Sequence, residues 1–575
     1  MNFEFLRRKE LAWFIVLLAI FAVLRLPAIH SPYHQDEYKW VQYAHPEITL
    51  PGTVPHPPLT EFIYAKTLGP LLGDSNFRFI PLIFSVANLF LIFYLAKIIF
   101  DPLDKLRASK TAFWTAFLFV TSFYSVLASL MVDVDGAIMP MFFLIMAIGY
   151  FKLKTSGFEL REGNWKWLVL LIVGAVGGFL IKVSAVLPIC ALALDFAIEK
   201  GAFRDKRKII KYIVFSFLGA VSLVAVLFLA RFVFPFFNLE YSFNYWKHFA
   251  NSSGFFDRGW LQTFIQFVKA ILYTSPLLLL PAFFIDKEIW RKLRPFFFFI
   301  FIGLMFYLFV FDFSIGALDR YFQFLVVPLC IISGAVFAKI FRNKEIKLKK
   351  EDFITVFIIT ISIFALQFFN HTVPPLYPKT EWLSRLLSLE WNFLFPFTGG
   401  SGPLGFYISF IFMALSYICS AVLAVAICIK KELKHKVFAV ILIIGLVYNF
   451  SFIEEYLFGK INGSAPKLLY DVTEFIKNDP DIKAVTVYND NGGYEIMKIG
   501  KYRRRLYTSP AFDVNQKIST LNATKDYYLE INIPRIDPNS VFRKYFDSCN
   551  VAYRETDKSI SATVYDCRNA PDIKN

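Results

Sequence analysis

Residues 11–29 read LAWFIVLLAIFAVLRLPAI, an apolar run that follows Arg7, Arg8 and Lys9. About 20 consecutive apolar residues are enough for a helix to cross the hydrocarbon core of a bilayer. No small-residue cleavage site follows the run, so we interpret it as a membrane span and not as a cleavable signal peptide. Similar runs recur along the chain, and 56% of its 575 residues are hydrophobic. The sequence therefore predicts a mainly α-helical, polytopic membrane protein.

The apolar runs predict a transmembrane bundle of about 13 spans. They lie at residues 11–29, 78–100, 111–130, 137–151, 167–181, 183–199, 210–234, 264–285, 295–311, 320–338, 353–370, 405–429 and 437–457. An odd number of spans places the two ends of the chain on opposite sides of the membrane.

Lys and Arg residues are concentrated in every second connecting segment. These segments are residues 7–9, 101–110, 152–166, 200–211, 286–294, 339–352 and 430–436. Cytoplasmic segments carry an excess of Lys and Arg, so we expect the N-terminus in the cytoplasm and the C-terminus outside the plasma (inner) membrane. The formal net charge of +16 follows from this distribution. Because the basic residues form no single patch, the expected partners include membrane lipids but not nucleic acid.

Residues 167–199 could form one long helix or a hairpin of two short helices. Both flanking segments, 152–166 and 200–211, are basic and should be cytoplasmic. The sequence therefore predicts a hairpin that turns near Lys182 and Ser184, with the preceding glycines allowing close helix packing.

The chain is expected to contain two domains, a transmembrane domain at residues 1–459 and a soluble extracytoplasmic α/β domain at residues 460–575. Three long outer segments of the first domain, 30–77, 235–263 and 371–404, are rich in aromatic residues and Pro. We expect them to lie partly along the membrane surface.

The C-terminal domain contains a helix-like run, Pro466–Lys477, and a strand-like run, Ala484–Tyr488. Cys549 and Cys567 flank two further strand-like runs that a hairpin would bring together. An oxidising exterior would permit a disulfide between them, and two free thiols are the alternative.

Two pairs of acidic residues are candidates for catalysis. Asp36 and Glu37 follow the first span, where a carboxylate could accept a proton from an attacking hydroxyl group. Asp133 and Asp135 lie at the outer turn between the third and fourth spans, within apolar sequence, and acids at membrane depth are functional candidates. The alternatives are ordinary solvated loop acids for the first pair and turn-capping acids for the second.

Cationic and polar groups are expected at the same outer level. They are Arg25, His56, Arg78, Lys182 and Arg320, followed by Tyr321. A phosphate group needs such donors, and Arg can bind it through two parallel hydrogen bonds. For each Arg or Lys alone, extension of the side chain to the membrane interface is the alternative, and for His56 the alternative is an ordinary loop histidine.

In chain order, these residues resemble the GT-C fold glycosyltransferases that use lipid-phosphate sugars, particularly the protein O-mannosyltransferases and the aminoarabinose transferases of lipid A. The matching features are Arg25 with Leu26, Asp36 with Glu37 and Tyr38, the turn His56-Pro57-Pro58-Leu59, Leu72 and Gly73 with Arg78, Asp133 or Asp135, Gly177 and Gly178 with Lys182, and Arg320 with Tyr321. The match covers about residues 20–200 and the region near residue 320. The second acid is doubled in this chain, and the C-terminal domain matches nothing that would name an acceptor.

This resemblance implies a polyprenyl-phosphate sugar as donor, an extracytoplasmic acceptor and an inverting displacement. Asp36 would be the base, assisted by Glu37, and the cationic residues would stabilise the departing phosphate. Many members of the family need no metal, so no cofactor is expected. Mg²⁺ or Mn²⁺ could still bind if the two acid sites converge.

Two other functions fit the same composition. A transporter or flippase for lipid-linked sugars would also need many spans and outer cations, but such proteins often contain internal repeats and midplane sites. This sequence shows no such duplication. A non-catalytic scaffold for a cell-envelope complex is the second alternative.

Overall fold

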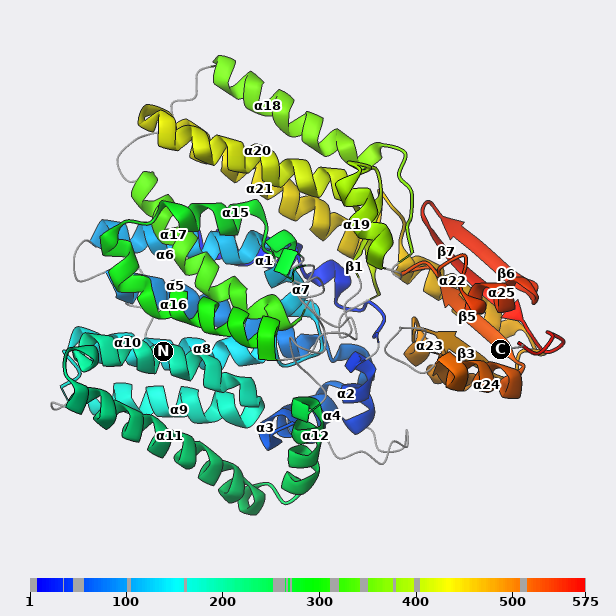
Figure 1. The fold of residues 1–575 in the computed structure, drawn as a ribbon, viewed down its shortest axis with the longest axis horizontal. Coiled ribbons are helices and arrows are strands. Elements are labelled where there is room, and N and C mark those ends of the chain that lie inside the picture. The colour runs from blue at the N-terminus through cyan, green and yellow to red at the C-terminus, as the bar shows by residue number, and fades with distance from the viewer. Residues whose placement is uncertain are drawn as a thin grey trace.

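The computed structural model describes residues 8–34, 36–44, 56–100, 105–159, 163–251, 264, 267–268, 271–310, 320–341, 350–375, 379–397, 404–506 and 514–573. The side chains of a few residues inside these helices, Asp36 among them, lie outside the description. Long helices run side by side through most of the molecule, and a small domain with a sheet lies at one end of them (Figure 1).

The helices of the large domain are α1 (Arg8–Val23), α2 (Asp36–Ala44), α3 (Pro58–Glu61), α4 (Leu68–Leu72), α5 (Phe79–Phe100), α6 (Lys105–Thr121), α7 (Phe123–Leu130), α8 (Ile138–Thr155), α9 (Trp165–Ile181), α10 (Val186–Glu199), α11 (Lys206–Val233), α12 (Leu239–Asn251), α15 (Pro276–Leu279), α16 (Lys287–Met305), α17 (Val326–Ile340), α18 (Lys350–Ala365), α19 (Lys379–Leu387), α20 (Phe410–Ile429) and α21 (Lys434–Leu457). A two-stranded hairpin, β1 (Leu394–Phe397) with β2 (Phe406–Ser409), precedes α20. The described parts of the three long outer segments contain the short helices α2 to α4, α12, and α19.

Eight helices among the described residues are long and apolar enough to cross a membrane. They are Lys9–Ala28, Asp74–Phe100, Ile138–Thr155, Lys206–Val233, Lys287–Val310, Tyr321–Ile340, Phe410–Ile429 and Lys431–Leu457. A ninth candidate is the pair Leu106–Thr121 and Phe123–Leu130, which is bent by 65°. Shorter apolar helices at Trp165–Ile181 and Val356–Phe368 coincide with two more expected spans. The chain is thus a polytopic helical membrane protein, as predicted.

The two remaining expected spans have a different form. Helix α10 has only 14 residues. The described part of residues 264–285 is interrupted at Ser275, which has a φ of 66° and precedes Pro276. Hydropathy alone therefore overestimated the regularity of residues 264–285, whereas α10 with the 3-10 turn before it matches the short helix expected at residues 183–199.

The predicted hairpin at residues 167–199 is present. Helices α9 and α10 are separated by Lys182 and a short 3-10 turn at Val183–Ala185. Gly174 lies so close to α8 that a Cβ atom there would be 2.5 Å from the backbone nitrogen of Met146. The absence of a side chain at this position lets α8 and α9 approach each other closely.

The C-terminal domain is a five-stranded mixed sheet with helices, which confirms the predicted α/β class. Its elements are α22 (Ala465–Asn478), β3 (Val485–Tyr488), α23 (Gly493–Lys498), β4 (Tyr502–Leu506), α24 (Val514–Thr524), β5 (Tyr527–Ile531), α25 (Val541–Asp547), β6 (Asn550–Asp557) and β7 (Ile560–Asp566). The strand order is β4-β3-β5-β7-β6, with β4 and β5 parallel to β3 and β7 antiparallel to both β5 and β6. Cys549 and Cys567 form a disulfide across the β6–β7 hairpin, with their Cα atoms 4.6 Å apart.

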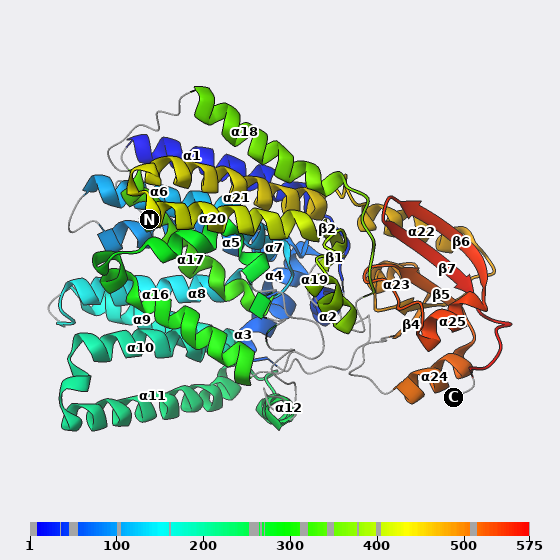
Figure 2. The same cartoon turned by 45° about the horizontal axis from the view of Figure 1, so that its top comes forward.

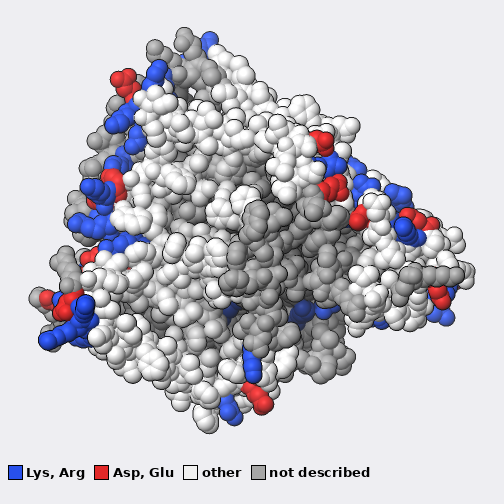
Figure 3. Space-filling model, viewed as in Figure 1, with Lys and Arg blue, Asp and Glu red and all other residues white. Residues whose placement is uncertain are grey.

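The soluble domain contacts the first outer segment directly. The Tyr38 hydroxyl of α2 donates to Asp490 Oδ2 at 2.6 Å, and the Tyr494 hydroxyl of α23 donates to Asp74 Oδ2 at 3.2 Å. Figure 2 shows the sheet beyond the same end of the bundle. In Figure 3 many Lys and Arg side chains gather along the end of the bundle opposite the C-terminal domain, and others lie on that domain and below the centre of the view.

Candidate active site

The turn between α7 and α8 is the centre of the candidate site. It carries Asp133 and Asp135, which are buried although charged side chains are seldom found inside proteins without a partner. Each acid contacts a different cation from a distant part of the chain. Asp133 Oδ2 lies 2.7 Å from an Arg320 guanidinium nitrogen, and Asp135 Oδ2 lies 2.6 Å from Lys182 Nζ. Four of the predicted residues thus meet in one cluster.

Tyr321 joins the two ion pairs. Its hydroxyl accepts a hydrogen bond from Arg320 at 3.1 Å, and Lys182 Nζ lies 4.7 Å from the centre of its ring. Lys182 reaches this position because it ends α9 at the hairpin turn, and Arg320 reaches it because it precedes the short helix before α17. The two cations remain partly accessible, with 16% and 17% of their side-chain surfaces exposed.

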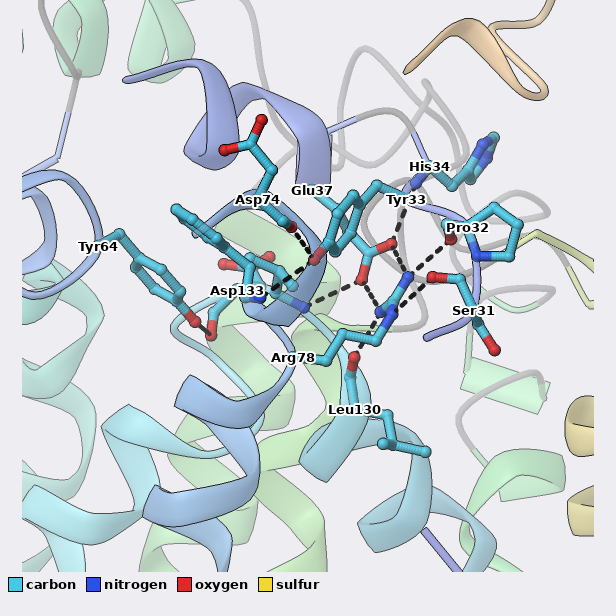
Figure 4. A network of polar contacts seen from close by, with 12 residues as sticks. Ser31, Pro32, Tyr33, His34, Glu37, Tyr64, Asp74, Arg78, Leu130 and Asp133 are labelled. Carbon is cyan, nitrogen blue, oxygen red and sulfur yellow. Dashed lines mark hydrogen bonds and ion pairs between the residues drawn. The ribbon is translucent and has the colours of Figure 1, made fainter. Parts of the chain in front are cut away.

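Glu37 and Arg78 form a second, fully buried part of the site (Figure 4). Two guanidinium nitrogens of Arg78 contact the two carboxylate oxygens of Glu37, at 2.6 and 2.9 Å. Glu37 also accepts from the backbone N–H groups of His34 and Val132, and the latter contact ties it to the turn that carries Asp133. Glu37 is therefore well placed to position α2, whose first residue is Asp36.

The contacts of Arg78 correct one sequence-based expectation. All five of its N–H groups have protein acceptors, namely both oxygens of Glu37 and the carbonyl groups of Ser31, Pro32 and Leu130. Binding a phosphate would require breaking several of these bonds. We therefore assign Arg78 a positioning role and not the phosphate contact that its sequence position suggested.

Arg25 is also fully buried and bound within the protein. Its side chain donates to the hydroxyl groups of Ser125 and Ser129 and to the carbonyl of Val120, all in or beside α7. These contacts hold the end of the first span against the helix that leads to Asp133. They correct the expectation that Arg25 contacts phosphate, because its donors point to α7.

The structure gives less detail for Asp36 and His56 than for the other candidate residues. Asp36 begins α2, but its side chain lies outside the described residues. The His56 ring lies 5.7 Å from the Trp40 ring of α2, just before α3. Thr60 of α3 donates to the carbonyl of Ile181, the residue before Lys182. The Pro57-Pro58 turn therefore brings His56 into the same region as the cluster.

Two residues beside the cluster were not identified from the sequence. The Tyr64 hydroxyl donates to the Asp133 carbonyl at 2.9 Å (Figure 4). Gln323 is buried one turn beyond Arg320, and its side-chain nitrogen and oxygen have no hydrogen-bond partner among the described residues. A polar residue inside an otherwise apolar span, three positions after Arg320, was the available signal for Gln323.

A small groove lies beside the ion cluster, between helices of the membrane domain. Asp135, Ser184, Tyr307 and Tyr321 form its polar part, and its other lining residues are apolar side chains of α8, α10, α16, α17 and the turn before α17. Its volume is about 30 Å³, which holds little more than a water molecule. Any larger ligand would have to widen it.

The electrostatics of the cluster depend on burial. Burial raises the pKa of Asp135, while Lys182 lowers that pKa and Asp133 raises it further. The negative charges of Asp133 and Asp135 and the positive charges of Lys182 and Arg320 cancel within the cluster. Among the described residues, no three His, Cys, Asp or Glu side chains gather as metal ligands would, and Asp133 and Asp135 each contact a cation.

Comparison with known proteins gives weak similarities only. No protein-family model and no curated protein matches the chain. The crystal structure of ArnT from Cupriavidus metallidurans in the apo state is similar with a TM-score of 0.48 and 11% identity, over 97% of this chain and 99% of that chain. The arabinosyltransferase EmbB from Mycobacterium smegmatis has a TM-score of 0.43 and 16% identity, over 80% of this chain and 42% of that chain. The residues of this chain therefore carry the functional proposal.

Proposed function

We propose that this protein is a membrane glycosyltransferase that moves a sugar from a polyprenyl-phosphate donor to an extracytoplasmic acceptor. One observation carries the proposal: Lys182, Arg320 and Tyr321 meet Asp133 and Asp135 in a partly accessible cluster. These are the residues whose order resembles the transferases that use lipid-phosphate sugars. The cluster offers the two kinds of group that such a reaction needs, cations for phosphate and carboxylates for proton transfer.

Lys182 and Arg320 are the proposed phosphate contacts. An incoming phosphate would replace the carboxylates of Asp135 and Asp133 as their partner, so that one anion exchanges for another. This exchange keeps both cations paired, and protonation of a displaced carboxylate would offset the cost of leaving it buried without its cation. The Tyr321 hydroxyl, already in contact with Arg320, can donate to a phosphate oxygen.

The groove beside Asp135 and Tyr321 is the proposed path for the prenyl chain. It begins at the ion cluster and continues between apolar side chains of membrane helices, as a ligand with a charged head and an apolar tail requires. Separation of α10 from α16 would be the simplest way to widen it, since both line it.

The proposed reaction is a direct displacement at the anomeric carbon. A carboxylate takes the proton from the acceptor hydroxyl, the acceptor oxygen forms a bond to the anomeric carbon, and the bond from that carbon to the phosphate oxygen breaks. Asp36 at the start of α2 is the proposed base, and Asp133 or Asp135 becomes available when phosphate takes its cation. Lys182 and Arg320 then stabilise the negative charge that develops on the departing phosphate.

The function is tested by incubating membranes that contain the protein with radiolabelled polyprenyl-phosphate sugars and fractionating the products. We expect label to move from lipid to an acceptor, and Asp36→Asn to reduce transfer by at least about 10²-fold, as expected for loss of a general base. Movement of intact donor across the membrane without transfer would instead favour the transporter. Normal transfer by Asp36→Asn would overturn its role as base.

A matched pair of lysine variants tests the phosphate site. Lys182 and Lys154 are 16% and 18% exposed, and each contacts a buried aspartate at 2.6 or 2.7 Å. Lys154 belongs to the cytoplasmic side in the proposed topology. Lys182→Met should therefore abolish transfer, while Lys154→Met should cost stability but keep transfer per folded molecule. Equal losses in both variants would contradict the assignment of Lys182.

A further inference from the structure

A second cavity lies away from the ion cluster, between α2 and the C-terminal domain. Its volume is about 770 Å³, which is within the range of pockets that bind small ligands. Three elements supply most of its lining: α2 with Tyr38, Lys39 and Gln42, together with β4 and α24. The cavity exists only because the soluble domain is docked on α2.

Positive charge dominates this cavity. The cationic residues in its lining are Lys39, Arg503, Arg504, Arg505 and Lys517. No carboxylate is among the described residues that line it. Two of these cations have acidic partners that do not line the cavity: Arg503 contacts Asp526 at 2.5 Å, and Arg505 lies 3.8 Å from Asp490.

The position of the cations favours a ligand over a protected sheet edge. β4 is an edge strand, and basic residues on such a strand commonly prevent pairing with another chain. Here, however, Lys39 and Lys517 face the same cavity from two helices outside the sheet. Thr520 and Thr524 of α24 also line it, and their spacing from Lys517 places all three on one face of that helix. Cations and hydroxyl groups thus converge from three elements.

The cavity also lies close to the proposed base. Tyr38 and Lys39 line it, while Glu37, in the same short helix, contacts Arg78 on the membrane side. The width of a helix with its side chains is about 10 Å. The short helix that begins with Asp36 therefore borders the cavity and also contacts Arg78 of the membrane domain.

We propose that this cavity binds the acceptor and that the acceptor is an anionic saccharide bearing phosphate or carboxylate groups. This inference rests on the proposed transferase function. Arg504, Lys39 and Lys517 hold the anionic groups, Arg503 and Arg505 add positive charge beside them, and an adjacent hydroxyl of the acceptor reaches toward Asp36. Such groups occur both on soluble envelope glycans and on lipid headgroups, and the experiment separates these two sources.

Binding is measured on the purified full-length protein in phosphatidylcholine nanodiscs. The probes are maltotetraose, phosphorylated maltotetraose and vesicles that contain phosphatidylglycerol. We expect the phosphorylated sugar to bind at least tenfold more tightly than the neutral one, with an affinity that falls as salt increases. Stronger retention on the vesicles than on the phosphorylated sugar would identify a lipid headgroup as the source of the anionic group. Equal binding of neutral and phosphorylated sugars would overturn the proposal.

Paired variants locate the binding. Arg504→Ala with Lys517→Ala should weaken binding of phosphorylated maltotetraose at least tenfold, and Arg504→Lys should retain most of it. The control is Lys467→Ala with Lys477→Ala, which removes two exposed cations from α22, outside the cavity. An equal loss in the control pair would show general charge attraction and overturn the site.

The binding assay and the transfer assay can fail separately. If phosphorylated maltotetraose binds through Arg504 and Lys517 but no sugar is transferred by the membranes, the transferase function fails and the anion site stands. If transfer occurs and the Arg504/Lys517 variant keeps the acceptor KM of the parent, the transferase stands and the acceptor cavity is overturned.

Discussion

At the scale of single residues, the ion pair of Arg78 and Glu37 is closed to solvent on both sides. Replacing one partner of a buried ion pair leaves an uncompensated charge and typically costs about 3–5 kcal/mol. Arg78→Met should therefore lower the midpoint of thermal unfolding of the detergent-purified protein, measured by size-exclusion chromatography after heating. Lys66→Met is the control, because Lys66 is 46% exposed and lies 3.7 Å from Glu61, as in surface pairs worth about 0–1 kcal/mol. An unchanged midpoint for Arg78→Met would contradict the buried pair.

The raised pKa of Asp135 predicts how donor affinity depends on pH. Burial shifts this pKa above the usual 3.8, so on acidification Asp135 becomes neutral at a higher pH than an ordinary carboxyl group does. Neutral Asp135 no longer competes for Lys182. A polyprenyl-phosphate sugar is a phosphodiester that keeps one charge at mildly acidic pH, so its affinity should rise as pH falls from 7 toward the pKa of Asp135.

Asp135→Asn provides the control for this pH dependence. At every pH tested, the variant should bind the donor as tightly as the parent protein does at low pH. Equilibrium binding of the donor to the protein in nanodiscs measures this. A parent protein whose affinity does not change with pH, or an Asn variant that keeps the pH dependence, would contradict the exchange of Asp135 for phosphate.

The sequence predicted the members of the cluster better than their individual roles. Asp133, Asp135, Lys182 and Arg320 could be grouped because the basic segments and apolar runs predicted the same level in the membrane for all four. The role of Arg78 could not be predicted in this way, because three of its acceptors are backbone carbonyl groups. Because every residue has a backbone carbonyl group, the sequence does not show which carbonyl groups accept hydrogen bonds from Arg78.

At the scale of elements, α2 is the helix on which the candidate site depends. It has nine residues, too few for a stable helix by itself, so its order comes from its contacts. Tyr38 bonds to Asp490 of the soluble domain, while Glu37 bonds to Arg78 of the membrane domain. Each contact anchors one side of the helix that begins with Asp36.

We therefore predict that Tyr38 and Asp490 are energetically coupled. Tyr38→Phe and Asp490→Asn should each lower the unfolding midpoint and the transfer rate. The double variant should lose less than the sum, since residues in direct contact commonly show coupling of about 0.5–3 kcal/mol. Tyr470→Phe on the exposed face of α22 is the matched control and should have no effect. Additive losses would show that the two side chains act independently.

The sequence predicted some helices and turns better than others. The α9–α10 hairpin was predictable because basic segments on both sides required an even number of crossings. The 65° bend between α6 and α7 was not, since Ser122 adopts an extended backbone within a continuous apolar run that contains neither Pro nor Gly. In such a run, tertiary packing decides where the helix breaks.

At the scale of the whole molecule, the β6–β7 hairpin and α22 were predictable from local pattern, but docking of the soluble domain on α2 was not. One of the docking contacts, between Tyr38 and Asp490, joins residues 452 positions apart through a hydroxyl and a carboxylate. The cationic cavity is a product of this docking. Its five basic residues are spread over three segments of the sequence, and only the run Arg503-Arg504-Arg505 was visible as a cluster.

The orientation of the molecule in the membrane is the last prediction. Basic segments alternate along the chain, and the Lys and Arg side chains at one end of the bundle lie opposite the soluble domain (Figure 3). The positive-inside rule then places the soluble domain and the candidate site outside the cell. Single cysteines introduced as Lys477→Cys in α22 and Lys208→Cys in α11 test this at two exposed positions. A membrane-impermeant maleimide should label the first in intact cells and the second only after lysis, with the parent chain as the background for the native thiols. The reverse pattern would place the cluster in the cytosol, where a donor presented at the outer leaflet could not reach it.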